Sequence, residues 1–336
     1  MRIAVDAMGG DFAPREIVAG AVEACRELGV DLLVVGNEIE VQNELKRHAT
    51  SGLKLEVVPA SEAIAMDEHP ATAVKRKKDS SLVVANRLVK DGTAAAVISA
   101  GNTGAAMAAS LLTLGRIPGI DRPAIASPMP TRTGVSVLLD AGANADCEPE
   151  YLLQFAMMGT IYAEQVLGIP KPRVGLLSIG EEETKGNKLT LATHQLLKQG
   201  KLNFIGNIEG RDVHRGTCDV IVCDGFVGNI VLKLSEGLAS VLMSQIKEAV
   251  SSSLISIAGG VLIKNSLHKL RSSMDYTEYG GAPLLGLNGV SLISHGSSNA
   301  KAIKNAIKAA QRAVREGVIE KIAATVKANE NDGLGE

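Results

Sequence analysis

The segment from Gly92 to Gly115 reads GTAAAVISAGNTGAAMAASLLTLG and carries no charged side chain. Its length and apolar character are those of a membrane span. However, Asn102, glycines, serines and threonines interrupt it, and it divides into a strand, a glycine-rich loop and an alanine-rich helix. A parallel strand buried on both faces, with the helix that covers it, is uncharged for the same reason as a membrane span. We therefore interpret this segment as the core of an α/β domain.

Outward from this segment, apolar strand-like runs alternate with helical patterns almost throughout the chain. The expected strands are Ile3–Asp6, Leu32–Val35, Leu55–Val58, Ala95–Ser99, Val135–Asp140, Val174–Ser178, Asp219–Cys223 and Val290–Ser294. The expected helices are Pro14–Leu28, Glu38–His48, Ser80–Val89, Pro149–Leu167, Leu189–Leu197 and Ser298–Glu316. This alternation predicts an α/β fold with a mostly parallel sheet and helices on both faces.

The chain has no visible repeat or low-complexity linker. We expect residues 1–326 to form one catalytic unit of two intimate subdomains, which includes a helical segment over 230–285. The last ten residues, 327–336, are expected to be a flexible tail.

Composition narrows the class of function. The chain has 336 residues, of which 46% are hydrophobic, and its formal net charge of −2 gives no general attraction to nucleic acid. Aromatic residues make up only 2%, with no Trp, which argues against base-stacking or sugar-stacking surfaces. The cysteines form no paired framework and are expected to be free thiols in a reducing cytoplasm; they are Cys25, Cys147, Cys218 and Cys223. Because Asp6 interrupts the N-terminal MRIAVDAMGG, no signal peptide is expected there.

Glycine-rich polar loops follow most of the expected strands. They are VDAMGGDFAP (5–14), ISAGNTG (98–104), LLDAGAN (138–144), LLSIGEEETKGN (176–187), IVCDGFVGN (221–229) and LISHGSS (292–298). The carboxyl ends of parallel strands lie along one edge of a sheet, so these loops can converge on one crevice, and glycine loops before helices favour anions. None matches a P-loop, and no dinucleotide-binding G-x-G-x-x-G fingerprint stands out. The pattern therefore predicts a phosphate-handling site.

Several long motifs, in this order, resemble the bacterial phosphate acyltransferase family of phospholipid synthesis. They are RIAVDAMGGDFAP, VKRKK, ISAGNTGA, GIDRPA, LLDAGAN, EEETKGN, DGFVGN, YGGAPLLG and SHGSS. The resemblance covers Met1 to about Val326. It implies a fold similar to isopropylmalate dehydrogenase and phosphotransacetylase, a homodimer, and transfer of a fatty acyl group from acyl-acyl carrier protein to inorganic phosphate. Phe12 stands where the family usually has His, so a catalytic imidazole is not expected there.

The chemistry of this reaction makes limited demands on the protein. Phosphate is already an anion and needs positioning rather than deprotonation, whereas the thioester oxygen needs donors as it gains charge. Lys185, beside Gly186 and Asn187, is the first choice for the cation, and the three acids before it, Glu181 to Glu183, are expected to orient it or to mark a loop that moves. Asn229 is the second catalytic candidate, with a plain helix N-cap as its alternative role. No organic cofactor is expected.

The SAGNTGA loop is the best candidate for a phosphate cradle, because small residues and side-chain donors precede an alanine-rich helix. The full set of expected phosphate- or substrate-binding residues is Gly9, Gly10, Asp11, Ser99, Gly101, Asn102, Thr103, Gly104, Asp140, Asn144, Gly186, Asp224, Gly225, Gly228 and His295. Thioester cleavage by phosphate does not require a metal. The aspartates near strand ends are therefore expected to hold loops and lysines rather than a divalent ion; they are Asp6, Asp11, Asp140 and Asp224.

Two further segments have alternative interpretations. The run Lys75, Arg76, Lys77 and Lys78 is either a solvated helix face or a docking surface for acidic acyl carrier protein.

In 251–270, apolar residues recur at helical spacing, Gly259 and Gly260 are expected to form a helical-hairpin tip, and basic residues follow. That pattern fits either dimer packing or shallow insertion into an anionic membrane surface. The expected membrane-contact residues are Leu254, Ile257, Ala258, Val261 and Leu262.

The resemblance implies a cytoplasmic protein, peripherally associated with the membrane, whose product a membrane glycerol-3-phosphate acyltransferase consumes. Three alternatives remain at this stage. A phosphotransacetylase-like enzyme would use acyl-CoA, an NAD-dependent hydroxy-acid dehydrogenase of the same fold would reduce nicotinamide, and a non-enzymatic membrane scaffold would bind carrier protein without needing Lys185.

Overall fold

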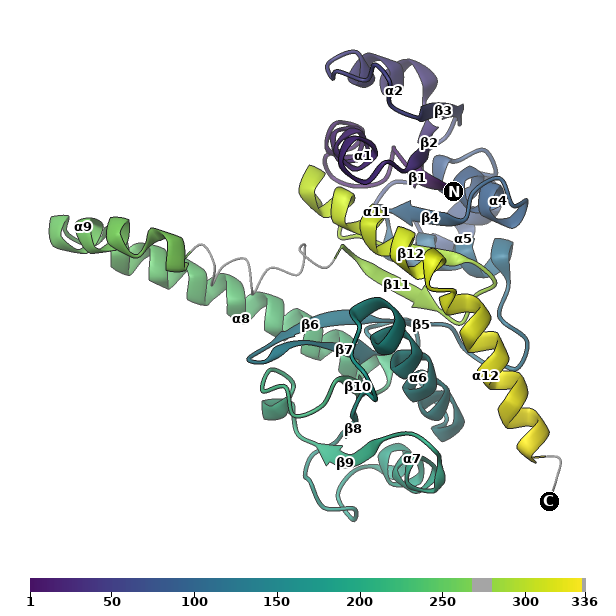
Figure 1. Ribbon diagram of the computed structural model, residues 1–336, viewed down its shortest axis with the longest axis vertical. Coiled ribbons are helices and arrows are strands. Elements are labelled where there is room, and N and C mark those ends of the chain that lie inside the picture. The colour runs from purple at the N-terminus through teal and green to yellow at the C-terminus, as the bar shows by residue number, and fades with distance from the viewer. Residues whose placement is uncertain (268–279, 334–336) are drawn as a thin grey trace.

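The computed structural model describes residues 1–267 and 280–333, and its first sheet is the larger of two (Figure 1). Its strands lie in the order β3 (Leu55–Pro59), β2 (Asp31–Gly36), β1 (Arg2–Asp6), β4 (Ala96–Ser99), β12 (Val290–Ile293), β11 (Ala282–Leu285) and β5 (Ala124–Ile125). The first five are mutually parallel, and β11 runs antiparallel to both of its neighbours.

The second sheet is formed by the middle of the chain. Its strands lie in the order β6 (Ser127–Thr131), β7 (Gly134–Leu139), β10 (Val220–Val222), β8 (Val174–Leu177) and β9 (Phe204–Ile208). Only β6 is antiparallel to its neighbour. The chain passes from the first sheet to the second between β5 and β6 and returns at β11.

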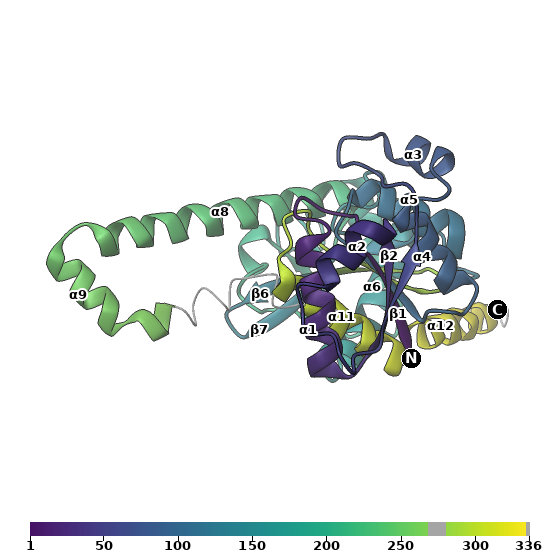
Figure 2. The same ribbon diagram turned by 90° about the horizontal axis from the view of Figure 1, so that it is seen from above.

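Helices cover both faces of the sheets, and two more form an arm that leaves the sheets (Figures 1 and 2). They are α1 (Arg15–Leu28), α2 (Glu38–Leu45), α3 (Pro70–Arg76), α4 (Ser81–Lys90), α5 (Thr103–Leu114), α6 (Pro149–Tyr162), α7 (Lys188–Gln199), α8 (Gly225–Ser251), α9 (Leu254–Leu262), α11 (Ala300–Arg315) and α12 (Val318–Gly333). Alternate residues of β1 show the layering. Ile3 and Val5 pack with α1 and α11, whereas Ala4 packs with α4. This is the pattern of a parallel strand that is buried on both sides.

The two sheets share a hydrophobic core. One cluster of buried residues joins Val5 of β1 and Ile303 of α11 to Leu139 of β7 and Phe155 of α6. Burial of this common apolar surface is lost if the halves separate, so they are held together by the hydrophobic effect. The α/β architecture, with a mostly parallel arrangement and helices on both faces, confirms the fold class predicted from the sequence.

All eight expected strands and six expected helices are present, with ends shifted by a few residues. The strands that the sequence did not predict are β5, β6, β9 and β11, which are short or lie at a sheet edge, or run antiparallel. Strand β6 contains Pro128 and Pro130, and proline is tolerated in an edge strand because it cannot donate to a ladder hydrogen bond. The expected tail was wrong over 327–333, since α12 continues to Gly333.

An arm of two helices extends away from the sheets (Figures 1 and 2). Helix α8 runs outward from the second sheet, and α9 folds back beside its outer end. The expected hairpin tip at Gly259 and Gly260 was wrong, because the chain turns at Ser252 and Ser253 and both glycines lie inside α9. The expected helical segment 230–285 was also inexact: α8 already begins at Gly225, and Ala282–Leu285 is strand β11. Residues 268–270, the end of the 251–270 segment in which a membrane or dimer contact was expected, lie outside the described residues.

Candidate active site

Loops at the carboxyl ends of β1, β4 and β12 meet at one edge of the first sheet. Strand β1 has β2 on one side and β4 on the other, so the direction of chain winding reverses between β1 and β4. Such a topological switch point opens a crevice at the carboxyl edge of a parallel sheet. We use the term glycine cluster for the loops there, which comprise residues 9–11, 99–104 and 295–298.

Close backbone contacts hold the glycine cluster together. The Ser99 hydroxyl donates to Asp6 Oδ2 at 2.7 Å, and the N–H of Asp11 donates to the carbonyl of Gly296 at 2.9 Å. A Cβ on Gly9 would lie 2.6 Å from Asp6 Oδ2 and 2.8 Å from the nitrogen of Gly101. Glycine is thus required at position 9 by the packing of its own loops, whether or not a ligand binds there. Burial raises the pKa of Asp6, against the opposing effect of hydrogen bonds from Ser81, Ser99 and the backbone.

Asn102 links the glycine cluster to helix α5 and to a neighbouring loop. Its Oδ1 accepts a hydrogen bond from the N–H of Ala105 at 3.0 Å and so caps α5. Its Nδ2 donates to the carbonyls of Met66 at 2.9 Å and Glu68 at 3.1 Å. Both hydrogens of the amide are therefore used inside the protein, and the part of Asn102 that remains for an anion is its backbone at the N-terminus of α5.

A second group of loops, the Asp140 cluster (residues 140–144 and 224–229), lies at the carboxyl edge of the second sheet. The buried Asp140 carboxylate accepts hydrogen bonds from the N–H groups of Ile125, Gly142, Ala143 and Asn144 at 2.7–3.1 Å. The Asn144 side chain also donates to it at 2.8 Å. Burial raises the pKa of Asp140, and these hydrogen bonds oppose that effect. Asp140 holds its loop, as expected from the sequence.

Asn229 lies on α8, in the second turn rather than at the start of the helix. The expectation that it opens the helix was wrong, because Asp224 is the N-cap and accepts the N–H of Val227 at 2.8 Å. A Cβ on Gly142 would lie 3.5 Å from Asn229 Oδ1, so the Asn229 amide lies over the Asp140 loop. The amide is exposed, and residues 1–267 and 280–333 provide it with no hydrogen-bond partner. It is thus available as a donor.

Lys185 follows β8, the strand next to β10. Its carbonyl accepts hydrogen bonds from Ser178 Oγ at 3.0 Å and Asn207 Nδ2 at 3.4 Å, which fixes the backbone of the loop. The ammonium is exposed and has no ion pair within the described part of the chain. Two of the three acids expected to orient it have other partners: Glu181 pairs with Arg211 at 3.4 Å and Glu183 with Lys198 at 2.7 Å.

Gly186 and Asn187 have structural tasks beside Lys185. Gly186 adopts a φ of +135°, and a Cβ there would overlap Thr190 Oγ1. Asn187 caps α7 by accepting the N–H of Thr190 at 2.9 Å. The loop that carries Lys185 therefore has a defined course, with a free cation at its surface.

The two clusters are connected through hydrophobic packing. Helices α5 and α8 pack on the same group of buried side chains, which includes Leu114 of α5 and Leu138 of β7, with Met107 of α5 and Val227 of α8 against it. The glycine cluster precedes α5, and the Asp140 cluster includes the start of α8. The structure thus brings two groups of the expected residues together, each within its own cluster, and describes no hydrogen bond between the clusters.

The remaining predicted residues have varied surroundings. His295 is exposed and its Nδ1 lies 2.7 Å from Ser297 Oγ. Thr103 is exposed in the first turn of α5, and Gly104 lies close to Pro70 of α3. Lys75 and Arg76 are exposed at the end of α3 and Lys78 is exposed just after it, and Arg76 lines a surface pocket of about 430 Å³. Lys77 is not free for docking, because it pairs with Glu68 at 2.6 Å.

Sequence reasoning did not single out the 62–68 loop or Asn207, although both support the predicted site residues. Asn207 donates to the carbonyls of Glu182 and Lys185, and the 62–68 loop accepts from Asn102. No residue pattern marked them, because each of these hydrogen bonds joins an asparagine side chain to a backbone carbonyl far away in the sequence.

Cys147 is a half-buried free thiol that contacts the Asp140 cluster. Its Sγ contacts the carbonyl of Asn144 at 3.6 Å, and burial, with the charges of Asp140 and Asp224, raises its pKa to about 12. The thiol is therefore protonated near neutral pH, and a protonated thiol is a poor nucleophile. We infer that Cys147 does not form an acyl-enzyme.

Cys147→Ser is accordingly expected to keep turnover in the acyl transfer predicted from the sequence motifs within about threefold of the wild type, because a protonated thiol supplies no nucleophile. Initial rates of thiol release at pH 7 would measure this. Treatment of the native protein with iodoacetamide, with urea-unfolded protein as the control, should modify Cys147 slowly. Trapping of an acyl group on Cys147 would contradict the inference.

Comparison with known proteins settles the family. A family model described as "Fatty acid synthesis protein" matches residues 1–321. The phosphate acyltransferase of Pelotomaculum thermopropionicum is 55% identical over 335 residues, which cover 100% of this chain and 98% of the relative. This chain belongs to the phosphate acyltransferase family. The phosphate acyltransferase of Heliobacterium modesticaldum, another member, is 57% identical over 96% of each chain. The family assignment confirms the resemblance seen in the motifs and the prediction that the chain is an enzyme.

Solved structures agree on the fold of this phosphate acyltransferase family member. A phosphotransacetylase from Streptococcus pyogenes superposes with a TM-score of 0.59 at 19% identity, covering 93% of this chain and 94% of the other. The EutD phosphotransacetylase from Staphylococcus aureus gives a TM-score of 0.58 at 17% identity, with the same coverage. A 4-hydroxythreonine-4-phosphate dehydrogenase from Klebsiella pneumoniae gives 0.51 at 14% identity over 94% and 99% of the chains. The same fold thus occurs in a transferase and in a dehydrogenase, so the fold by itself does not choose between those reactions.

Proposed function

We propose that this enzyme transfers a fatty acyl group from acyl-acyl carrier protein to inorganic phosphate, with Lys185 and Asn229 as its catalytic residues. The observation that supports this best is an exposed ammonium and an exposed amide, neither with a described partner. The ammonium of Lys185 is on the loop after β8, and the amide of Asn229 is near the start of α8, the helix that follows the adjacent strand β10. The glycine cluster supplies the N-terminus of α5 as a site for the phosphate dianion. We propose that it faces the Asp140 cluster across one substrate cleft.

The chemistry needs no group that the chain lacks. A phosphate oxygen attacks the thioester carbon, and the carbonyl oxygen becomes an oxyanion that Asn229 and Lys185 stabilise. The oxyanion then collapses, the carbon–sulfur bond breaks, and the carrier thiolate leaves with the electron pair and takes a proton from solvent. The products are acyl phosphate and the free carrier thiol. Within the described residues, no group of three or more His, Cys, Asp or Glu side chains is arranged to bind a metal ion.

The decisive assay mixes the enzyme with acyl-acyl carrier protein and measures thiol release with and without phosphate, with acyl phosphate captured as its hydroxamate. The proposal requires both products to appear in equal amounts and only with phosphate. Equal or faster turnover of acyl-CoA in the same assay would favour the phosphotransacetylase-like alternative. Nicotinamide reduction by a hydroxy acid would favour the dehydrogenase.

For carrier docking we propose the exposed residues Lys75, Arg76 and Lys78. Lys75 and Arg76 end α3 and Lys78 follows just after it, and the first residue of this helix, Pro70, contacts Gly104 of the glycine cluster. A basic surface next to the active site would steer an acidic carrier toward it and lose its effect as salt is added.

For the helical arm we propose two contacts. The face of α8 exposes apolar residues Ile230, Leu234, Leu238 and Val241, with 50–68% of each exposed, which suits packing against a second copy in a homodimer. By length and composition α8 could also cross a membrane, but Gly228 in its second turn packs against the backbone of Asp140 in the enzyme body. We therefore propose that the enzyme is cytoplasmic and that α9 contacts the membrane surface, where a membrane glycerol-3-phosphate acyltransferase could receive the acyl phosphate.

Leu262→Glu is expected to weaken binding to anionic vesicles at least about tenfold, because burial of one leucine stabilises by about 2 kcal/mol and a carboxylate is repelled by anionic lipid. Leu262 and Ile255 are each 86% exposed on α9. Vesicle co-sedimentation would measure the loss. Ile39→Glu is the matched control, since Ile39 is 73% exposed on the body of the enzyme. Unchanged vesicle binding together with loss of the dimer would instead assign α9 to subunit contact.

A further inference from the structure

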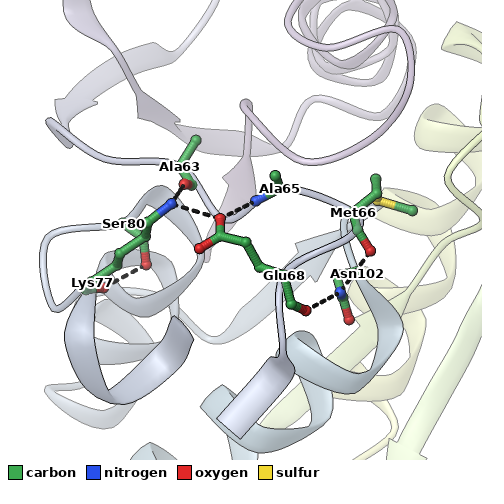
Figure 3. A network of polar contacts seen from close by, with 7 residues as sticks. All are labelled: Ala63, Ala65, Met66, Glu68, Lys77, Ser80 and Asn102. Carbon is green, nitrogen blue, oxygen red and sulfur yellow. Dashed lines mark hydrogen bonds and ion pairs between the residues drawn. The ribbon is translucent and has the colours of Figure 1, made fainter. Parts of the chain in front are cut away.

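An ion pair holds the loop before α3 in a defined conformation (Figure 3). Lys77 Nζ contacts Glu68 Oε1 at 2.6 Å and also donates to the carbonyl of Ala63 at 2.8 Å. The same Glu68 oxygen accepts the N–H of Ala65 at 2.7 Å. About 30% of each charged side chain is exposed, so the pair is partly shielded from solvent. One lysine thus closes residues 63–68 into a compact loop, which we call the strap.

The other side of the strap lies on the glycine cluster. The Asn102 amide donates to the strap carbonyls of Met66 and Glu68 (Figure 3). Its oxygen caps α5. The methyl group of Met66 lies 2.8 Å from where a Cβ on Gly296 would be, so the strap also covers the loop after β12. Asn102 therefore receives its orientation from both sides, from α5 and from the strap.

We propose that Lys77 and Glu68 are positioning residues, which act through the strap and Asn102 to set the affinity of the enzyme for phosphate. This inference rests on the proposed function, in which the N-terminus of α5 receives the phosphate. Preorganised N–H groups bind an anion better than mobile ones, because less ordering is required on binding. Lys77 has a second effect at the same place, since its charge balances the Glu68 carboxylate, which would otherwise repel an anion nearby. The Lys77 hydrogen bond also lowers the pKa of Glu68 and keeps that carboxyl ionised.

The test compares Lys77→Met with Lys77→Arg, which retains the charge, and with Asn102→Ser, which retains a capping oxygen but cannot reach the strap. Lys77→Met and Asn102→Ser are each expected to raise the KM for phosphate about tenfold with kcat within about twofold of the wild type. Both substitutions interrupt the same series of contacts from Lys77 through the strap to Asn102. The KM of the double variant for phosphate should therefore be no higher than that of the weaker-binding single variant. Lys77→Arg should recover most of the phosphate affinity. Hydrogen exchange in 62–69 and 100–106 should accelerate in both affected variants.

Lys304→Met is the matched control. Lys304 also pairs with a glutamate, Glu27 at 3.0 Å, but it joins α11 to α1 away from the strap. It should change thermal stability without changing the KM for phosphate. If Lys77→Met lowers stability as this control does and leaves the phosphate KM unchanged, the proposal is overturned. A salt-dependent rise in the KM for the acyl donor alone would also overturn it and assign Lys77 to carrier docking.

A binding measurement separates this inference from the proposed function. Inorganic phosphate is titrated calorimetrically into the full-length wild type and each variant. If the wild type lacks phosphate-dependent acyl transfer, the proposed function fails, yet a tenfold weaker phosphate Kd in Lys77→Met and Asn102→Ser would still support the strap. An unchanged Kd in both variants would reject the strap whatever the activity.

Discussion

Lys185→Met is expected to lower kcat/KM for phosphate-dependent thiol release by about 10²–10³, the usual cost of removing one group that stabilises developing oxyanion charge. The ammonium of Lys185 has no ion pair among residues 1–267 and 280–333, whereas Glu181 and Glu183 beside it are already paired with Arg211 and Lys198. Its charge is therefore available for an anionic substrate. Because the side chain is exposed and unpaired, the variant should keep its thermal midpoint within a few degrees of the wild type.

Lys188→Met provides the comparison for Lys185, since Lys188 is exposed at the first position of α7, three residues further on. It should retain nearly full activity. The kcat/KM of Lys185→Arg should fall between those of Lys185→Met and Lys188→Met, because the charge remains but the compact ammonium is replaced by a planar group. Retention of wild-type kcat/KM by Lys185→Met would remove the lysine from the proposed chemistry and would favour a role for the chain as a scaffold.

The strands of the parallel core could be predicted from the sequence, because a strand buried on both faces is a nearly continuous apolar run. The uncharged run from Gly92 to Gly115 could only be a buried strand with its helix or a membrane span, and its polar loop favoured the strand and helix. Strands such as β6 leave no such pattern, because an edge strand with Pro128 and Pro130 can be mostly proline and polar residues and still pair on one side. The division into two sheets was also not predictable, since it depends on which strands pair across large sequence separations.

The candidate site was predictable in part for a similar reason. Glycine-rich loops after parallel strands must lie at one sheet edge, so the grouping within each cluster follows from local sequence. What a side chain does there depends on partners that the sequence does not mark. Asn102 and Asn187 looked alike as polar loop residues. The structure shows that both are helix caps, and that Asn102 alone also holds the strap.

Gly228→Ala is expected to reduce the free energy of unfolding by about 3 kcal/mol or more and to abolish most activity, because overpacking against backbone cannot be relieved by a rotamer change. Gly228 lies in the second turn of α8, and a Cβ there would overlap the carbonyl oxygen of Asp140 and lie 2.9 Å from the Asp140 carbonyl carbon. To accept the methyl group, α8 would have to move away from β7. That movement would carry the neighbouring Asn229 with it and disturb the hydrogen bonds to the Asp140 carboxylate.

Gly237→Ala on the same helix tests whether this effect comes from packing or from glycine as such. No atom lies within 4 Å of a Cβ at Gly237, so alanine there should stabilise α8 by up to about 1 kcal/mol through its higher helix propensity. Urea unfolding followed by circular dichroism would measure both variants, and the thiol-release assay would measure their activity. If α8 is anchored on β7 by its first two turns, Gly228→Ala must lower the free energy of unfolding and Gly237→Ala must raise it. A Gly228→Ala protein as stable and active as the wild type would mean that α8 does not pack there, and Asn229 would then lose its position over the Asp140 loop.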